Sequence, residues 1–181
     1  PEVRAVVTVA GNLDPDAWAD YHGWQRQPKD LSVQEVLEDR LGTLLGKHVD
    51  IVAAGRTDAG VHAIAQVVHF DTDAQRQERS WVLGCNVNLP EQVNVLWARP
   101  VSPDFSARYS ALSRSYRYEI LNRPVRSALA SRRAVWFHPP LDAERMHRAG
   151  QALPGPAGDL AAAGGAAEGA VERSFTDLPS H

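Results

Sequence analysis

The chain has 181 residues, and its 44% hydrophobic and 23% charged residues are typical of one globular domain with a sizeable core. No stretch approaches the ~20 apolar residues of a membrane helix, and an acid at position 2 is unlike a signal peptide. A single cysteine, Cys85, excludes a disulfide framework within the chain and favours a reducing, cytoplasmic location.

The net charge of −3 is unevenly distributed along the chain. Eight arginines and only two acids lie between Arg99 and Arg133, whereas acids outnumber bases elsewhere. Such a band can attract the phosphates of a nucleic acid while the rest of the surface repels them. An ordinary solvated face would have the same composition, and charge alone does not separate these two interpretations.

The elements expected first along the chain are a strand and a helix. Alternating apolar residues predict a strand at 3–9. After a turn-rich stretch, Ser32 and Glu35 form a capping box before an apolar stripe, so a helix is expected from Ser32 until Gly46 ends it. The elements expected beyond it are strands at 49–53 and 65–70, a helix at 75–84, strands at 93–97 and 115–121, and a helix at 141–153 capped by Asp142.

This order of elements is strand, helix, strand, strand, helix, strand, followed by one more strand. It predicts an α+β fold of the ferredoxin-like type, in which helices cover one face of an antiparallel sheet. We expect residues 1–153 to form one domain. Residues 154–181 are dominated by alanine, glycine and proline, which predicts a flexible or poorly packed tail.

The stretch AGRTDAGVHA at 54–63 is the strongest candidate for a functional site. It joins two predicted strands, where a rigid scaffold can present the carboxylate of Asp58 to a substrate. Gly55 and Gly60 permit close approach of a substrate, and Arg56 would favour the ionised form of Asp58 that a nucleophile requires. In an anonymous sequence the favoured alternative is that Asp58 caps a turn and pairs with Arg56 on the surface. No metal site is expected.

The sequence around this stretch resembles the TruA family of tRNA pseudouridine synthases. GRTDAGVHA is preceded by YHGWQRQ and followed by QVVHF, and the likeness continues through LGCNVNLP, DFSARYSALSRSYRYEILNRPVR and LDAERMHRAGQAL. It covers roughly Tyr21 to Leu153. The resemblance implies a fold of the pseudouridine synthase type, an isomerase that needs neither metal nor cofactor, a tRNA partner and a homodimer.

The resemblance also implies roles for individual residues. Asp58 would be the nucleophile that allows the uracil to leave C1′ through N1 and rejoin it through C5, in a uridine flipped out of the anticodon stem-loop. Arg56 would fill the vacated space, and Tyr116 would stack on the uracil, which is worth about 1–3 kcal/mol. The arginines expected to contact phosphate are Arg108, Arg114, Arg117, Arg123 and Arg126. The side chains expected in the core are Trp24, Cys85, Phe105 and Tyr118.

Two departures from the family pattern leave other functions open. The compact YDG segment that usually precedes GWQ is missing, and no second half, with its basic partner for Asp58, is visible. The chain therefore resembles the N-terminal half of the family pattern, and we expect an exposed Asp58 and self-association through uncovered apolar surface. The alternative function is a catalytically inactive RNA-binding remnant. A hydrolase that uses Asp58 and His62 is a distant third.

Overall fold

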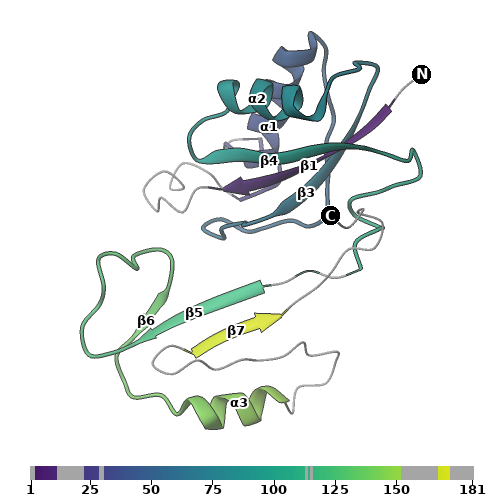
Figure 1. Ribbon diagram of the computed structural model, residues 1–181. Coiled ribbons are helices and arrows are strands. Elements are labelled where there is room, and N and C mark those ends of the chain that lie inside the picture. Colours follow the sequence, from purple (N-terminus) through teal and green to yellow (C-terminus); the bar gives the residue numbers. More distant parts are fainter. Residues whose placement is uncertain are drawn as a thin grey trace. The chain divides into compact units, whose positions relative to one another are not determined.

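The structure is a computed structural model that describes residues 3–11, 23–28, 31–112, 114, 116–151 and 167–171. The chain forms two compact units, unit 1 (Pro1–Ala111) and unit 2 (Leu112–His181) (Figure 1). The sequence predicted one domain as far as residue 153, and the structure divides that range in the stretch of turns that follows residue 101.

Unit 1 is built on a four-stranded antiparallel sheet. Its strands are β1 (Val3–Gly11), β2 (Val52–Ala53), β3 (Gln66–Thr72) and β4 (Val93–Val101), in the order β2-β3-β1-β4. The first strand therefore lies inside the sheet, where Val7 is opposite Val68 of β3 and Ala98 of β4. Val6 and Val7 point to opposite faces and are both fully buried, so both faces of the sheet are covered.

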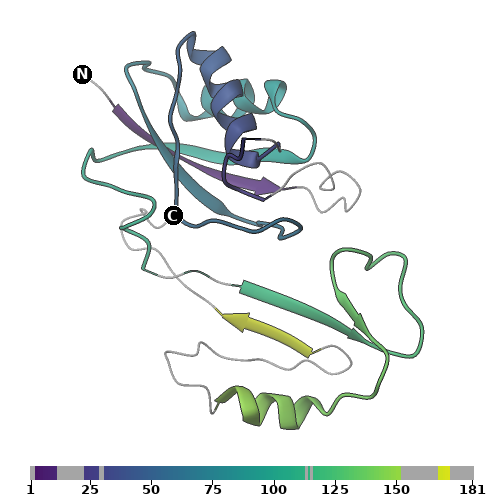
Figure 2. The ribbon, with the colours of Figure 1, turned by 180° about the vertical axis from the view of Figure 1, so that it is seen from behind.

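Two helices, α1 (Val33–Leu45) and α2 (Glu78–Asn88), cover one face of this sheet (Figures 1 and 2). Val7, Leu37 and Trp81 come from β1, α1 and α2 and belong to a single cluster of buried residues. Within it the ring of Phe70 meets that of Trp81 edge to face, with centroids 5.5 Å apart and planes at 72°. The amphipathic pattern of α1 is thus satisfied by the sheet below it.

The chain after β4 packs against the opposite face of the sheet at His69. The buried backbone N–H of Ala107 donates to His69 Nδ1 at 3.0 Å, and the rings of His69 and Phe105 meet edge to face at 6.2 Å. Burial, with the nearby charge of Arg4, lowers the pKa of His69. The neutral ring is the form that accepts this hydrogen bond, because a protonated Nδ1 has no lone pair to offer.

Arg4 adds a second attachment for the same stretch of chain. Its guanidinium donates to both carboxylate oxygens of Asp71, at 2.6 and 2.8 Å, and to the carbonyl oxygens of Pro103 at 2.6 Å and Phe105 at 2.8 Å. The hydrogen bond from Arg4 lowers the pKa of Asp71. One side chain on β1 therefore connects the end of β3 to the chain that leaves β4.

Unit 2 contains a three-stranded sheet and one described helix. Its strands β5 (Tyr116–Asn122), β6 (Val135–Phe137) and β7 (Ala167–Val171) lie in the order β6-β5-β7, with β6 parallel and β7 antiparallel to β5. The helix is α3 (Ala143–Gln151), of which only Gly150 is buried. The amide of Asn122 donates to the carbonyls of Phe137 and Pro139 at 2.8 and 2.6 Å, which fixes the chain between β6 and α3.

The predicted caps of α1 and α3 are confirmed, whereas α2, predicted from residue 75, begins at Glu78. Ser32 Oγ accepts from the backbone N–H of Glu35 at 3.1 Å, Gly46 ends α1 with φ of 68°, and Asp142 Oδ1 accepts from the N–H of Arg145 at 2.9 Å. The order of the first seven elements is confirmed as well, in an α+β structure with an antiparallel sheet.

The structure also contains strands that the sequence did not indicate. These are β6 and β7, and β7 lies within the segment 154–181 that was predicted to be a tail. Strand pairing uses the backbone, so a stretch with few core-forming side chains can still pair with β5. The rest of that segment lies outside the described residues. Within the described ranges, no helix is both long and apolar enough to cross a bilayer.

Candidate active site

The aspartate loop, residues 54–65, connects β2 to β3 and is held at its start by hydrogen bonds to β3. The N–H of Ala54 donates to the carbonyl of Val67 at 2.8 Å, and the amide of Gln66 donates to the carbonyl of Gly55 at 2.7 Å. The two ends of the loop are therefore fixed to the same edge of the sheet.

The tip of the aspartate loop is a tight turn. The N–H of Val61 donates to the carbonyl of Asp58 at 3.2 Å, and Gly60 between them has a left-handed φ of 79°. Only glycine adopts such an angle without strain, which accounts for Gly60 in the motif. The turn places Asp58 at the outer end of a loop whose base is anchored in the sheet.

Asp58 and Arg56 are both exposed, and no ion pair joins these two described side chains. The surface ion pair between these two side chains, which was the favoured alternative for an anonymous loop, is not formed. The structure agrees with the expectation that Asp58 is exposed, and His62 on the same loop is half-buried. Both the carboxylate of Asp58 and the guanidinium of Arg56 are thus accessible to solvent.

The remaining predicted site residues are divided between the two units. Arg108 belongs to unit 1, where its guanidinium lies over the ring of Tyr109 at 5.5 Å. Tyr116, Arg117 and Arg126 belong to unit 2 and are exposed. Because neighbouring strand residues point to opposite faces, Tyr116 and Arg117 cannot serve the same face of β5.

Three of the predicted phosphate-binding arginines make contacts within unit 2 or are partly buried, which limits how freely they can reach a phosphate. Arg117 lies 3.8 Å from the carboxylate of Glu119, an exposed pair that is weak. Arg123 donates from Nε to the carbonyl of Val125 at 2.6 Å, and Arg114 is half-buried. Exposed Arg108, Arg117, Arg123 and Arg126 leave most of the predicted phosphate contacts accessible to solvent.

A model of the family described as tRNA pseudouridine synthase matches residues 19–110, which include the aspartate loop and the strands β2, β3 and β4 of the unit 1 sheet but not β1. The chain belongs to this family. It is similar to the protein named tRNA pseudouridine synthase A in Methylococcus capsulatus, with 53% identity over 135 residues, 75% of this chain and 50% of the relative. The protein of the same name in Escherichia coli is 52% identical over 150 residues, 83% of this chain and 55% of the relative.

The chain thus spans about half the length of the curated pseudouridine synthases it matches. A third relative, tRNA pseudouridine synthase A of Cronobacter sakazakii, is 48% identical over 152 residues, which cover 84% of this chain and 56% of the relative. The family match includes Asp58, Arg56 and Arg108 and ends before Tyr116.

The predictions for core aromatic residues were right for two of three side chains. Trp24 and Phe105 are buried, with 4% and 6% exposed. Tyr118 is 61% exposed, so its assignment to the core is wrong. Tyr116 and Tyr118 share one face of β5, and no described element of unit 2 buries that face. Cys85 is buried as predicted, and burial raises the pKa of its thiol to about 11.

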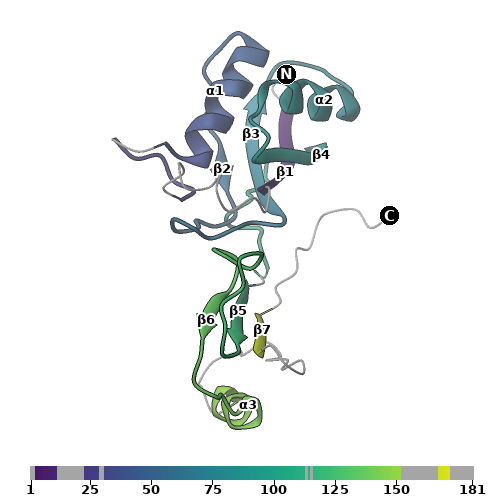
Figure 3. The same cartoon turned by 90° about the vertical axis from the view of Figure 1, so that its left-hand side faces the viewer.

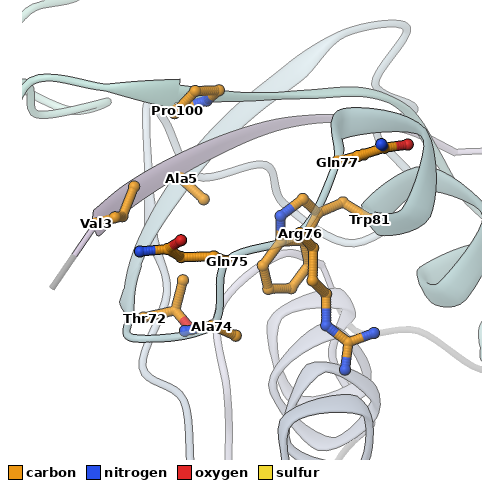
Figure 4. A pocket seen from close by; sticks show the side chains of 9 residues that line it. All are labelled: Val3, Ala5, Thr72, Ala74, Gln75, Arg76, Gln77, Trp81 and Pro100. Atoms are coloured by element: carbon orange, nitrogen blue, oxygen red, sulfur yellow. The ribbon is translucent and has the colours of Figure 1, made fainter. Parts of the chain in front are cut away.

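A hollow of about 400 Å³ in unit 1 lies at the end of β3 opposite the aspartate loop, beside the start of α2 (Figure 4). Its lining is mostly apolar and includes Val3, Trp81 and Pro100, with the amides of Gln75 and Gln77 at its rim. Among the described residues, no group of three His, Cys, Asp or Glu side chains could hold a metal ion.

Sequence reasoning did not identify the Gly23–Trp24 backbone segment, which contacts the aspartate loop. The N–H of Trp24 donates to the carbonyl of Thr57 at 2.9 Å, next to Asp58. Gly23 beside it has a left-handed φ of 87°. The signal was the dipeptide Gly-Trp in YHGWQRQ, but a sequence does not show which loop such a dipeptide contacts.

Proposed function

We propose that this chain provides the nucleophile-bearing part of a tRNA pseudouridine synthase, with Asp58 as the nucleophile acting on uridine in the anticodon stem-loop. The observation that carries the proposal is the position of Asp58: an exposed carboxylate on a loop fixed to the sheet, inside the sequence range that matches the family. The curated relatives are named for this activity.

The chemistry requires only a well-placed carboxylate. Isomerisation breaks the N1–C1′ bond of uridine and forms a C5–C1′ bond, while C5 loses its proton to solvent and N1 gains one. The carboxylate of Asp58 attacks either the sugar or the uracil ring and is released when the new bond forms, so no atoms or electrons are gained overall. No metal or cofactor is needed in this scheme.

RNA binding would come from basic and aromatic residues of both units. Arg56 would occupy the space left by the flipped uridine, and Tyr116 would stack on the uracil. The proposed phosphate contacts are Arg108, Arg114, Arg117, Arg123 and Arg126. Arg117 faces away from Tyr116 on β5, so these two contacts would lie on opposite faces of that strand.

We further propose that unit 1 has the ferredoxin-like topology. The order β2-β3-β1-β4, the antiparallel pairing and the two helices on one face support this assignment. We also propose a homodimer that works in the cytoplasm, by analogy with the family. One buried cysteine is consistent with a reducing compartment.

The decisive experiment measures tritium release from tRNA that carries 5-tritiated uridine. The chain is assayed together with the C-terminal half of the Escherichia coli relative, since this chain spans half of that protein. Asp58→Asn should abolish release and keep tRNA binding, because the amide preserves shape but is a poor nucleophile. The control is Asp50→Asn, which removes an 88% exposed carboxylate paired with His48 and should keep the parent rate.

Each outcome of this assay separates the two functions. Release by Asp58→Asn at the parent rate would refute the assignment of Asp58. Binding of tRNA by the parent without any release would instead support the RNA-binding remnant.

A further inference from the structure

Gly23 lies in direct backbone contact with the peptide that carries Asp58. A Cβ atom added at Gly23 would lie 2.7 Å from the carbonyl oxygen of Thr57, 3.0 Å from the carbonyl carbon of Asp58 and 3.1 Å from the nitrogen of Ala59. All three neighbours are backbone atoms, so none can rotate away as a flexible side chain could. Any side chain at this position must displace the aspartate loop or be displaced by it.

The segment that presents Gly23 is itself fixed to the core. The indole of Trp24 is buried in the main cluster, and the backbone N–H of Trp24 donates to the carbonyl of Thr57 at 2.9 Å. The carbonyls of Gly23 and Trp24 accept from the N–H groups of Val33 and Gln34, at 3.3 and 3.0 Å, at the start of α1. These bonds satisfy donors that a helix otherwise leaves without partners. The residue that touches the aspartate loop is therefore held by both the core and a helix.

We propose that Gly23 is a positioning residue for the reaction: its missing side chain sets the distance between the core and the aspartate loop, and so the place of the Asp58 carboxylate. This inference rests on the proposed function of Asp58. A displacement of about 1 Å in a reacting group can cost ~10²-fold in rate. A methyl group forced into a 2.7 Å contact requires a shift of that size, because carbon and oxygen in contact lie about 3.3–3.6 Å apart.

Gly46 offers a matched control for the backbone effect. It also has a left-handed φ, 68°, but an added Cβ there would have no atom within 4 Å. Gly23→Ala and Gly46→Ala therefore both place a side chain at a left-handed φ, and only the first also carries the clash. Any difference between the variants at the aspartate loop reports the contact itself.

The first measurement is structural and does not require activity. In ¹⁵N-labelled chain, Gly23→Ala should shift the backbone amide resonances of Thr57, Asp58 and Ala59 and speed hydrogen exchange of the Trp24 amide, whereas Gly46→Ala should change neither. If Gly23→Ala fails to fold, Gly23→Asn replaces it, compared with Gly46→Asn, since asparagine accepts a positive φ and still has a Cβ. Unchanged loop resonances in the Gly23 variant would overturn the proposal.

The second measurement is the single-turnover rate of tritium release in the complemented assay. Gly23→Ala should lower the rate by ~10²-fold and leave the Kd for tRNA within about twofold, because all the proposed RNA contacts except Arg56 lie outside the aspartate loop. Gly46→Ala should keep the parent rate. Equal rates for the two variants would refute a positioning role. An active Asp58→Asn would refute the proposed function alone, because the loop resonances test the contact of Gly23 independently.

Discussion

Replacing Arg4 with methionine should destabilise unit 1 by about 3 kcal/mol, mainly through the carbonyls that Arg4 holds. The pair with Asp71 is bidentate, but Asp71 is 48% exposed, and exposed pairs contribute roughly 0.2–1 kcal/mol. The bond to the carbonyl of Phe105 is partly buried, and a buried acceptor left without its donor costs about 1–3 kcal/mol. Asp71→Asn, which leaves the carbonyl bonds in place, should therefore cost at most about 1 kcal/mol.

Native-state hydrogen exchange of the β1 amides measures this difference, because β1 is an interior strand and its amides exchange only when unit 1 opens. Arg40→Met is the matched control: Arg40 is 47% exposed and lies 3.7 Å from its neighbour Asp39. The control should change the free energy of opening by less than about 0.5 kcal/mol. The reasoning is refuted if Asp71→Asn costs as much as Arg4→Met.

Two further predictions concern pH and the exposed tyrosines. Since burial lowers the pKa of His69 below its usual 6.5, the unfolded chain binds more protons just below that pH. Unit 1 should therefore be fully stable above about pH 6.5 and lose stability as the pH falls below it, and His69→Gln should flatten this dependence in urea titrations at several pH values. Tyr116→Ala should reduce isomerisation by about 5- to 150-fold, the loss of one stacked base, whereas Tyr118→Ala should leave the melting temperature unchanged. A fall of several degrees for Tyr118→Ala would show that this ring is covered after all.

The elements that the sequence predicted well are those with local signals. Helix α1 has a capping box at Ser32, an apolar stripe and a glycine stop, and all three act within a few residues. Helix α2 was predicted at 75–84 but extends to Asn88, beyond the glycine and asparagine residues that favoured an end. Asn86 explains the extension, because its amide donates to the carbonyl of Val95 at 2.9 Å and accepts from its N–H at 2.7 Å. The contact of Asn86 with Val95 therefore outweighs the local tendency of glycine and asparagine to end a helix.

The features that the sequence did not reveal depend on partners distant in the chain. Strand β6 has only three residues and follows an arginine-rich stretch, so it is too short to show an alternating pattern. It is defined by its pairing with β5. Tyr118 lies in an alternating sequence typical of a half-buried strand, yet burial of its ring depends on whether another layer covers its face of β5. Asp58 could be chosen from its motif, but its support by Gly23 joins residues 35 apart in sequence. The roles of Arg56 and Tyr116 remain predictions.

The interior position of β1 has a consequence for synthesis of the chain on the ribosome. This strand is made first, but one of its two partners, β4, ends about 90 residues later. At a translation rate of 5–20 residues per second, one edge of the apolar strand VRAVVTVAG stays unpaired for roughly 5–20 s, until β4 has been synthesised. An unpaired apolar strand is a template for pairing with other chains. Nascent unit 1 should therefore depend on chaperone binding to β1 until translation has passed Val101.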